Sequence, residues 1–174
     1  MSKVINVFGG PGVGKSTTAA GVFYHLKLNR KSTELVREYA KELVWDEAYV
    51  KLEDQLAVTS EQNRRMWQLR KKVDYIVTDS PLLLGIHYMQ PDYFPEYFEK
   101  MVWEIWNCYD NMNFLIDRQG PYDTNGRYHS EEEAKQLDLE IKEMLDKNNI
   151  PYYTVTEGEF AAVSIVNRII GKDY

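Results

Sequence analysis

The sequence has little cysteine and histidine, and it has no long apolar run. Cys108 is the only cysteine among 174 residues, which excludes an internal disulfide and a cysteine-rich zinc site. The three histidines, His25, His87 and His129, are not spaced like the ligands of a transition metal. No apolar segment approaches the ~18 residues that a membrane-spanning helix requires. We therefore expect no membrane segment, and the near absence of cysteine favours a reducing, cytoplasmic location.

The charge balance is acidic, and the length suits one domain. The 174 residues carry 21 basic and 27 acidic side chains, a formal net charge of −6. This balance weakens a role in coating nucleic acid through charge, although it leaves room for a local basic patch. The N-terminal apolar segment ends at Gly9-Gly10 without a small-residue cleavage pattern, so we do not expect a secretion signal. We expect a single domain over residues 1–174.

Short β-branched segments alternate with helical patterns along the chain. Strands are expected at residues 3–8, 33–36, 75–78, 113–117 and 152–156. Helices are expected at 15–28, 38–48, 53–72, 97–109, 130–147 and 160–170. Ser130 with Glu133 is a capping-box signature for the fifth helix. The alternation predicts an α/β fold with a parallel sheet and helices on both faces, whereas a helical bundle leaves five β-rich segments unexplained.

A phosphate-binding sequence follows the first expected strand. Residues 9–16 read GGPGVGKS and match the pattern G-x-x-x-x-G-K-[ST], with a strand expected before them and a helix after them. Glycines let backbone N–H groups approach phosphate oxygens, and the start of a helix adds partial positive charge. Lys15 should reach the β- and γ-phosphates of a nucleoside triphosphate, and Ser16 should bind Mg²⁺. The predicted nucleotide-binding residues are Gly9, Gly10, Pro11, Gly12, Val13, Gly14, Lys15, Ser16 and Thr17.

Several classes of P-loop protein lack support in the sequence. It contains no Asn-Lys-x-Asp motif for guanine, and Asp79-Ser80-Pro81-Leu82 lacks the glycine of a GTPase switch. The Leu-Ser-Gly-Gly signature of transporter ATPases is absent, and a AAA+ machine needs a longer chain with a helical lid domain. We therefore expect a compact phosphotransferase that uses ATP and Mg²⁺.

Two carboxylates follow expected strands and are candidates for catalysis. Functional residues of a parallel sheet gather at the carboxyl ends of its strands. Asp79 ends the third strand, where it could hold a metal-bound water or orient the attacking hydroxyl. Glu38 follows the second strand, where it could accept the proton of an acceptor hydroxyl. Both residues are candidates for the general base, and the sequence does not separate them.

Polar residues on other segments are candidates for binding the acceptor or the phosphates. Gln62 and Arg65 lie three residues apart on one expected helix, so both can face the acceptor. Arg37 could bind a phosphate or a ring substituent. The polar loop over residues 118–129 carries Arg118 and Arg127. We expect this loop to act as a lid that brings at least one arginine to the transferring phosphoryl group.

These residues make the chain resemble the P-loop nucleoside and nucleotide kinases. It is similar in particular to the ribosylnicotinamide-kinase domain of bacterial bifunctional NAD-biosynthesis proteins. It also resembles small phage-encoded P-loop kinases, some of which phosphorylate hydroxymethylpyrimidines in DNA. The resemblance spans most of the chain and rests on residues 9–16, Val36-Arg37-Glu38-Tyr39-Ala40, Gln62-x-x-Arg65, Val77-Thr78-Asp79-Ser80, the arginine loop and Asn149-Ile150-Pro151-Tyr152.

The resemblance implies a three-layer fold with a five-stranded parallel sheet in the order 2-3-1-4-5. It implies that the acceptor binds between the second strand and the helix that carries Gln62. In related deoxynucleoside kinases the carboxylate after the second strand is the base, which favours Glu38. Tyr39 and Tyr88 fall in segments expected near the acceptor, where their rings could stack against it.

The implied activity is transfer of the γ-phosphoryl group of ATP to a hydroxyl of a nucleoside-like acceptor. A free nucleoside or nucleotide is favoured. A hydroxymethylpyrimidine within DNA is the alternative, which the basic residues Arg64, Arg65 and 70–72 permit and the net charge of −6 opposes. A regulatory ATPase or a nucleotide-gated binding protein is the alternative of another class. A homodimer is considered as the assembly.

Overall fold

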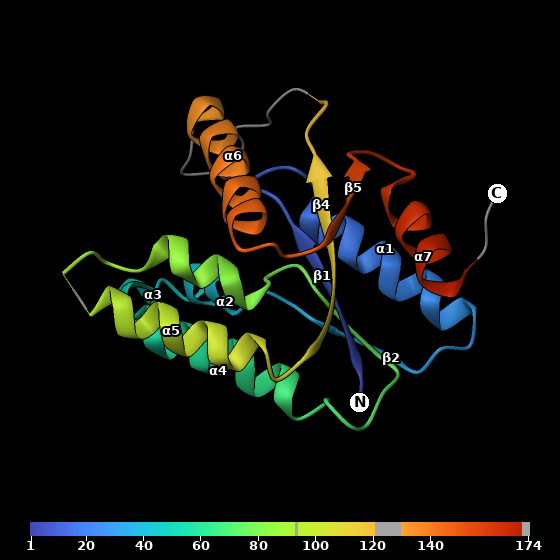
Figure 1. Cartoon of the computed structure of the whole chain (residues 1–174), viewed down its shortest axis with the longest axis horizontal. Helices are drawn as coiled ribbons and strands as arrows, with labels where there is room; N and C mark the ends of the chain where they lie inside the picture. Colours follow the sequence, from blue (N-terminus) through green and yellow to red (C-terminus); the bar gives the residue numbers. More distant parts are fainter. Residues whose placement is uncertain (93, 121–129, 172–174) are drawn as a thin grey trace.

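A parallel β-sheet forms the centre of the molecule (Figure 1). The structure, a computed structural model, describes residues 1–92, 94–120 and 130–171. The strands are β1 (Lys3–Phe8), β2 (Thr33–Val36), β3 (Tyr75–Thr78), β4 (Asp110–Asp117) and β5 (Tyr152–Thr156). They pair in the order β2-β3-β1-β4-β5, and every pairing is parallel. The predicted architecture and strand order are therefore confirmed.

Helices cover both faces of this sheet. They are α1 (Lys15–Leu28), α2 (Tyr39–Trp45), α3 (Tyr49–Glu53), α4 (Gln55–Trp67), the 3₁₀ helix η1 (Leu82–Tyr88), α5 (Pro95–Trp106), α6 (Glu131–Lys147) and α7 (Ala161–Ile170). Helices α1 and α7 lie on one face, and α4, α5 and α6 lie on the other (Figure 1). Within the described ranges, no helix is both long and apolar enough to cross a membrane.

Alternate side chains of the strands build an apolar layer on each face. In β1, Val4 and Phe8 pack among buried side chains of α4, α5 and α6. Ile5 and Val7 point to the opposite face and pack among those of α1 and α7. Side chains of a strand alternate between faces, so a strand covered on both sides is largely apolar. The buried polar side chain of β1, Asn6, donates hydrogen bonds to Oδ1 of Asn111 and of Asn113. This double burial explains the apolar sequence of β1 and holds the loop that follows it.

Some boundaries differ from those expected, because long-range pairing overrides local preference. Strand β4 begins at Asp110 rather than at residue 113, since its first residues pair with the start of β1. The expected helix over 53–72 begins at Gln55, where the carboxylate of Asp54 accepts the N–H of Ala57, and ends at Trp67. Helix η1 was not expected; its buried residues Leu82, Leu83 and Leu84 hold it on the sheet.

Helix α6 begins with the predicted capping box. Oγ of Ser130 accepts the N–H of Glu133 at 3.2 Å, and Oε2 of Glu133 accepts the N–H of Ser130 at 2.7 Å. Acidic residues in the first turn also interact favourably with the positive end of the helix dipole. These contacts fix the start of a helix that, as shown below, touches the phosphate-binding loop.

The parallel register brings the carboxyl ends of the strands to one edge of the sheet. Val36 at the end of β2 pairs with Thr78 at the end of β3, and Phe8 at the end of β1 pairs with Leu115 of β4. The segments that follow these strands therefore emerge side by side. They carry all the residues that the sequence analysis placed after strands.

Replacing Gly21 by alanine tests how closely α1 packs against α7. A Cβ at Gly21 would lie 2.6 Å from the Cβ of Ala162, which is closer than two carbons can approach. Overpacking typically costs ~1–3 kcal/mol, against a gain of ~1 kcal/mol when alanine replaces glycine in a helix. We expect Gly21→Ala to lower the free energy of unfolding in urea by about 1 kcal/mol.

A second substitution provides the control. Ala162→Gly, introduced into the Gly21→Ala variant, removes the opposing methyl group and makes room for the new one. The double variant should be no less stable than Gly21→Ala. Glycine in place of alanine in a helix costs ~1 kcal/mol. If the double variant loses this full amount of unfolding free energy relative to Gly21→Ala, the two helices are not in tight contact.

Candidate active site

The phosphate-binding loop joins β1 to α1 at the carboxyl edge of the sheet. Gly14 is the N-cap of α1 and has a φ of 81° and a ψ of 17°. Glycine adopts this left-handed conformation without a steric cost, which explains why the pattern requires it here. Among the described residues, no side chain caps α1, so backbone N–H groups of its first turn can bind an anion. Ser16 and Thr17 are exposed at this end of the helix.

The side chain of Lys15 folds back over this loop. Its Nζ donates a hydrogen bond to the carbonyl oxygen of Gly10 at 2.9 Å. Burial lowers the pKa of the ammonium, and nearby carboxylates oppose this shift. The charged side chains that influence it are Glu38, Asp79, Asp138 and Arg118. Lys15 is therefore placed where charged groups from several segments meet.

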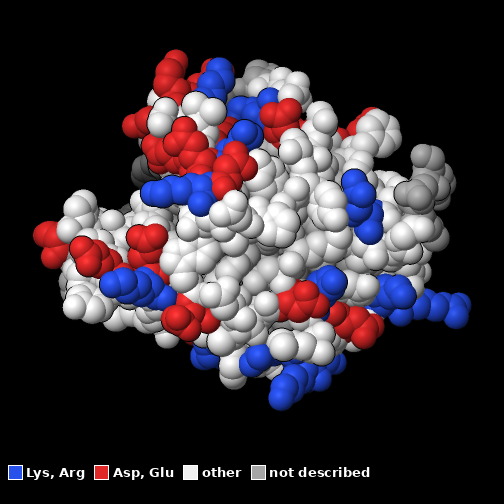
Figure 2. Space-filling model, viewed as in Figure 1, with Lys and Arg blue, Asp and Glu red and all other residues white. Residues whose placement is uncertain are grey.

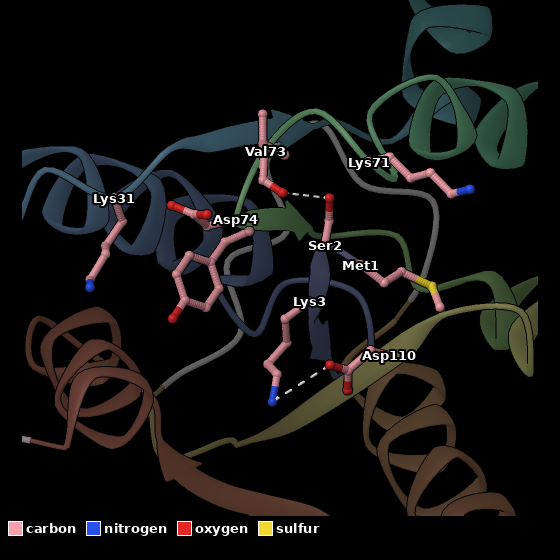
Figure 3. Close-up of a pocket in the computed structure, with 9 residues that line it drawn as sticks. Met1, Ser2, Lys3, Lys31, Lys71, Val73, Asp74 and Asp110 are labelled. Carbon is pink, nitrogen blue, oxygen red and sulfur yellow. Dashed lines mark hydrogen bonds and ion pairs between the residues drawn. The ribbon is translucent and has the colours of Figure 1, made fainter.

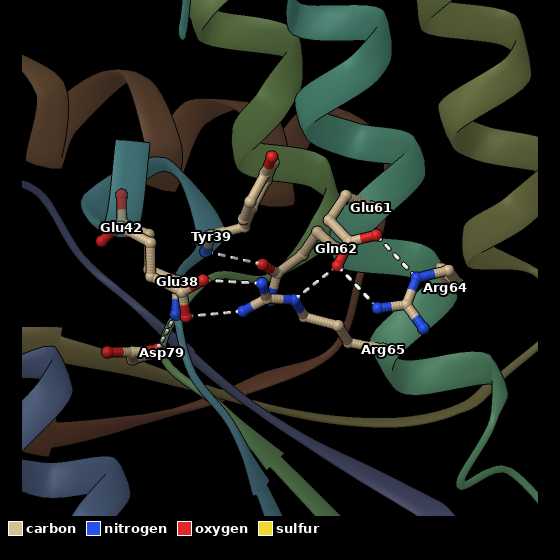
Figure 4. A network of polar contacts seen from close by, with 8 residues as sticks. All are labelled: Glu38, Tyr39, Glu42, Glu61, Gln62, Arg64, Arg65 and Asp79. Carbon is tan, nitrogen blue, oxygen red and sulfur yellow. Dashed lines mark hydrogen bonds and ion pairs between the residues drawn. The ribbon is translucent and has the colours of Figure 1, made fainter. Parts of the chain in front are cut away.

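Asp79 and Glu38 meet at the ends of neighbouring strands. Asp79 follows β3 and is buried, and its Oδ1 accepts the backbone N–H of Glu38 at 3.0 Å (Figure 4). Glu38 follows β2 and is the N-cap of α2. The two carboxylates that the sequence analysis singled out are thus brought together beside Lys15.

The surroundings of Glu38 raise the pKa of its carboxyl group. Burial is the main cause, and the negative charge of Asp79 acts in the same direction. Lys15 and Lys41 oppose the shift through their positive charges. A carboxylate with a raised pKa is a stronger base, so this environment suits proton transfer from a hydroxyl.

Gln62 supports the first turn of α2 from the adjacent helix α4. It is 3 % exposed, and its Oε1 accepts the N–H of Tyr39 at 3.0 Å (Figure 4). Its Nε2 donates to Oγ1 of Thr78 at 3.4 Å. Tyr39 is the first residue of α2, where backbone N–H groups lack partners within the helix. The amide of Gln62 therefore faces the protein's own chain, and its expected contact with an acceptor stays a prediction.

Arg65 is held by two carboxylates and one ring. Its guanidinium donates to both oxygens of Glu42 at 2.7 Å each and to Glu61 at 2.9 Å (Figure 4). The same group lies 4.7 Å from the centre of the Tyr39 ring. Hydrogen bonds from Arg64 and Arg65 lower the pKa of Glu61 to about 2. This network joins α4 to α2, and binding of an acceptor by Arg65 stays a prediction.

Tyr88 lies beside Glu38 at the end of η1. Burial raises the pKa of its phenol, and the negative charge of Glu38 acts in the same direction. The residue is nevertheless 45 % exposed, so part of it can contact a ligand. Arg37 is also exposed, next to Glu38 in the chain. Contact of Tyr88 and Arg37 with an acceptor stays a prediction.

Arg118 lies against the phosphate-binding loop rather than in solvent. Its Nε donates to Oδ2 of Asp138 at 2.6 Å, and one Nη donates to the carbonyl oxygen of Pro11 at 2.8 Å. The side chain of Arg118 is only 8 % exposed. Arg127, the other expected catalytic arginine, lies outside the described residues, as does most of the expected lid.

Asp138 is a residue of this site that the sequence analysis missed. It lies on α6, and its Oδ1 accepts the N–H of Gly10 at 2.6 Å. The one available signal is its position among the buried residues Ala134, Ile141 and Leu145, which share its side of the helix. A single carboxylate within an apolar stripe indicates a specific partner, but the sequence does not say which one.

A cavity of about 530 Å³ opens at the opposite edge of the sheet (Figure 3). It lies at the amino ends of β1, β3 and β4, where Lys3 approaches Asp110 at 3.7 Å, and Lys31 and Lys71 also line it. None of the predicted site residues lines this cavity. The candidate site is therefore defined by the phosphate-binding loop and its neighbours, not by this hollow.

Charged side chains are distributed unevenly over the surface (Figure 2). Acidic groups gather over α6, where some Lys and Arg side chains lie among them, and small groups of both signs occur elsewhere on this face. Within the basic run on and after α4, Arg64 and Arg65 both pair with Glu61. These ion pairs reduce the positive charge that the run could offer to a nucleic acid.

The chain matches a known family and several solved structures. A family model described as an AAA domain matches residues 4–162, from β1 to the start of α7. No curated protein sequence matches the chain. The description of this family includes the term AAA. The described residues nevertheless contain no separate helical lid domain, which we expect of a AAA+ machine.

Three solved structures illustrate the likeness in fold. NadR protein in complex with NR has a TM-score of 0.65 at 16 % identity, covering 98 % of this chain and 51 % of the NadR chain. Deoxyadenosine kinase from M. mycoides with bound dATP has a TM-score of 0.65 at 19 % identity, covering 96 % and 99 %. Shikimate kinase from Acinetobacter baumannii in complex with shikimate has a TM-score of 0.51 at 13 % identity, covering 98 % and 91 %. This chain spans about half the length of the NadR chain.

These findings agree with the sheet order and with the phosphate-binding loop. Strands β1 and β3 stand next to each other, and the loop follows β1, as the resemblance to P-loop kinases implied. At such low identities the solved structures show the fold alone. The chain belongs to the AAA-domain family of P-loop proteins, and its fold is that of the P-loop kinases.

Proposed function

We propose that the protein is an ATP- and Mg²⁺-dependent phosphotransferase that moves the γ-phosphoryl group to a hydroxyl of a nucleoside-like acceptor. The observation that carries this proposal is the meeting of Glu38 and Asp79 beside Lys15 at the phosphate-binding loop. The fold supports it, because deoxyadenosine kinase and shikimate kinase share that fold. The bound NR and dATP in two of the similar structures favour a nucleoside-like acceptor, free rather than within DNA.

Lys15, the loop backbone and two oxygen donors would hold the nucleotide and its metal. Backbone N–H groups at the start of α1 and the Lys15 ammonium would bind phosphate oxygens. The hydroxyl of Ser16 and the carboxylate of Asp79 are oxygen donors of the kind that Mg²⁺ prefers, and Mg²⁺ needs only one or two of them beside waters and phosphates. When bound, the ion neutralises charge on the phosphates. The described residues contain no group of three or more His, Cys, Asp or Glu side chains that could hold a metal ion.

Glu38 is the better candidate for the general base. Asp79 already uses Oδ1 to hold the Glu38 backbone, which suits a fixed role in orienting the metal and the loop. The pKa of Glu38 is raised by burial, and Tyr88 lies on its side of the site. Glu38 would accept the proton of the acceptor hydroxyl as the oxygen attacks the γ-phosphorus.

The remaining predicted residues would shape the acceptor and phosphate sides. Tyr88 and Tyr39 would contact the ring of the acceptor, and Arg37 would reach a polar group on it. Gln62 and Arg65 would act by holding the first turn of α2, in agreement with their contacts to Tyr39. Arg118 and Arg127 would stabilise the charge of the transferring phosphoryl group.

Transfer of radiolabelled γ-phosphate tests this function directly. The protein is offered labelled ATP and Mg²⁺ with nucleosides, with nucleotides, or with DNA that does or does not contain hydroxymethylpyrimidines. We expect label in a free nucleoside or nucleotide. Label in modified DNA alone would favour the DNA-directed alternative, and label only in inorganic phosphate would favour a regulatory ATPase.

Replacing Lys15 by alanine should reduce this transfer by about 10²–10³-fold, the usual effect of removing a donor that stabilises developing charge. Circular dichroism should remain unchanged, because the hydrogen bond that the Lys15 side chain makes lies within its own loop. Lys27→Ala, on an exposed part of the same helix, is the control. Equal turnover in Lys15→Ala and the control would contradict the assigned role.

Replacing Glu38 by glutamine should separate activity from stability. Loss of a general base is expected to lower kcat by about 10²–10⁴-fold. It should also remove the fall in rate at low pH that protonation of the base causes. The pKa of Glu38 is higher in the folded protein than in the unfolded chain. Glu38 therefore contributes fully to the free energy of unfolding at pH values below the pKa of the unfolded chain, and this contribution is lost as the pH rises through the pKa of the folded protein. The Tm of Glu38→Gln should therefore exceed that of the wild type at pH 7–8, and the difference should shrink toward pH 4.

Glu34→Gln is the matched control, since Glu34 lies two residues before the end of β2 and pairs with Lys27 at the surface. It should leave the pH profile of transfer unchanged. A fall in rate at low pH that persists in Glu38→Gln but vanishes in Asp79→Asn would assign the base to Asp79 instead.

A further inference from the structure

One carboxylate, that of Asp138, joins three parts of the site that lie far apart in the sequence. Its Oδ1 accepts the N–H of Gly10, and its Oδ2 accepts the Nε–H of Arg118, each at 2.6 Å. Arg118 in turn donates to the carbonyl oxygen of Pro11 at 2.8 Å. Helix α6, the phosphate-binding loop and the segment after β4 are thereby connected by a closed set of hydrogen bonds.

This contact accounts for a glycine that the phosphate-binding pattern does not require. Gly10 occupies one of the variable positions of G-x-x-x-x-G-K-[ST]. A Cβ at Gly10 would lie 2.6 Å from Oδ1 of Asp138 and 2.8 Å from the carbonyl oxygen of Ala134. Glycine is therefore required at this position for α6 to approach the loop as closely as it does.

The ion pair brings a fixed positive charge to the loop. The side chains of Arg118 and Asp138 are 8 % and 21 % exposed, so water screens their interaction only weakly. The pKa of Lys15 is lowered mainly by its burial; the negative charge of Asp138 raises it, and the positive charge of Arg118 lowers it. Lys15 Nζ donates to the carbonyl oxygen of Gly10, and Arg118 donates to that of the next residue, Pro11, so both cations lie against the same stretch of the loop.

Packing alone does not explain an aspartate at this position. The capping box and the buried residues Ala134, Ile141 and Leu145 already fix α6 on the sheet. A partly buried charge pair costs desolvation that an apolar side chain of similar size would avoid. The carboxylate is therefore better explained by the two donors that it orients.

We propose that Asp138 is a positioning residue for phosphoryl transfer. It holds the loop at Gly10 and aims Arg118 at the phosphate side, so that Arg118 and Lys15 meet the nucleotide in a fixed geometry. The inference rests on the proposed function and extends it to a residue on α6. Asp138 would act through Gly10 and Arg118, the two groups that it contacts.

Asp138→Asn separates the two contacts of the carboxylate. Its amide oxygen can still accept the N–H of Gly10, but its amide nitrogen is a donor and cannot pair with the Nε–H of Arg118. We expect kcat to fall about 10²-fold, the effect of a misplaced catalytic group, with a smaller but measurable weakening of ATP binding, because the contacts of Asp138 and Arg118 are made to the phosphate-binding loop. The double variant Asp138→Asn with Arg118→Ala should be no slower than Arg118→Ala alone, because the two residues act as one unit.

Glu143→Gln is the matched control, because it removes one exposed carboxylate from the same helix. Its kcat should equal that of the wild type. Wild-type kcat in Asp138→Asn would overturn the proposal, as would multiplicative losses in the double variant. A loss of activity that matches the loss of folded protein, measured by thermal unfolding, would assign Asp138 a structural role only and would also overturn it.

The failure of the proposed function can be told apart from the failure of this inference. If the wild type transfers no phosphate to any acceptor, the same cycle is measured on the affinity for Mg-ATP by calorimetry. Non-additive effects of Asp138→Asn and Arg118→Ala on that affinity would support positioning at the nucleotide even without transfer. Additive effects there would overturn the inference as well.

Discussion

The parallel pairing of β3 with both β1 and β2 is the constraint on which the site depends. It places the ends of three strands at one edge, so the loop after β1, Glu38 after β2 and Asp79 after β3 become neighbours. Both faces of the sheet are buried, which fixes its register. A shift of one residue in β2 would turn its side chains to the other face and separate the two carboxylates.

The sequence alone was sufficient to predict those features of the site and its supports that depend on short-range patterns. The phosphate-binding loop has a local pattern, and the capping box of α6 spans only four residues. The proximity of Glu38 and Asp79 followed from the general rule for strand ends in parallel sheets. The strand order came from the resemblance to a family and not from the residues themselves.

The remaining features depend on contacts between distant segments. Asp138 and Gly10 are 128 positions apart, and nothing near either residue in the sequence identifies the other. Helical spacing correctly put Gln62 and Arg65 on α4, but it could not show that they face Tyr39 and two glutamates. Long polar side chains find partners according to the packing of whole helices, which a single sequence does not reveal. The expected length of β4 was too short for the same reason, because the polar residues at its start form part of the strand only through their pairing with β1.

The contact between α1 and α7 has a consequence for how the molecule opens. Helix α1 begins at the phosphate-binding loop, and it packs against the last described helix with no space at Gly21 for a methyl group. Undocking of α7 would expose the apolar side of α1 to water. The backbone amides of the two helices should therefore exchange with solvent deuterium as one cooperative unit, with similar protection. The end of the fold that carries the phosphate-binding loop would then be only as resistant to local opening as α7.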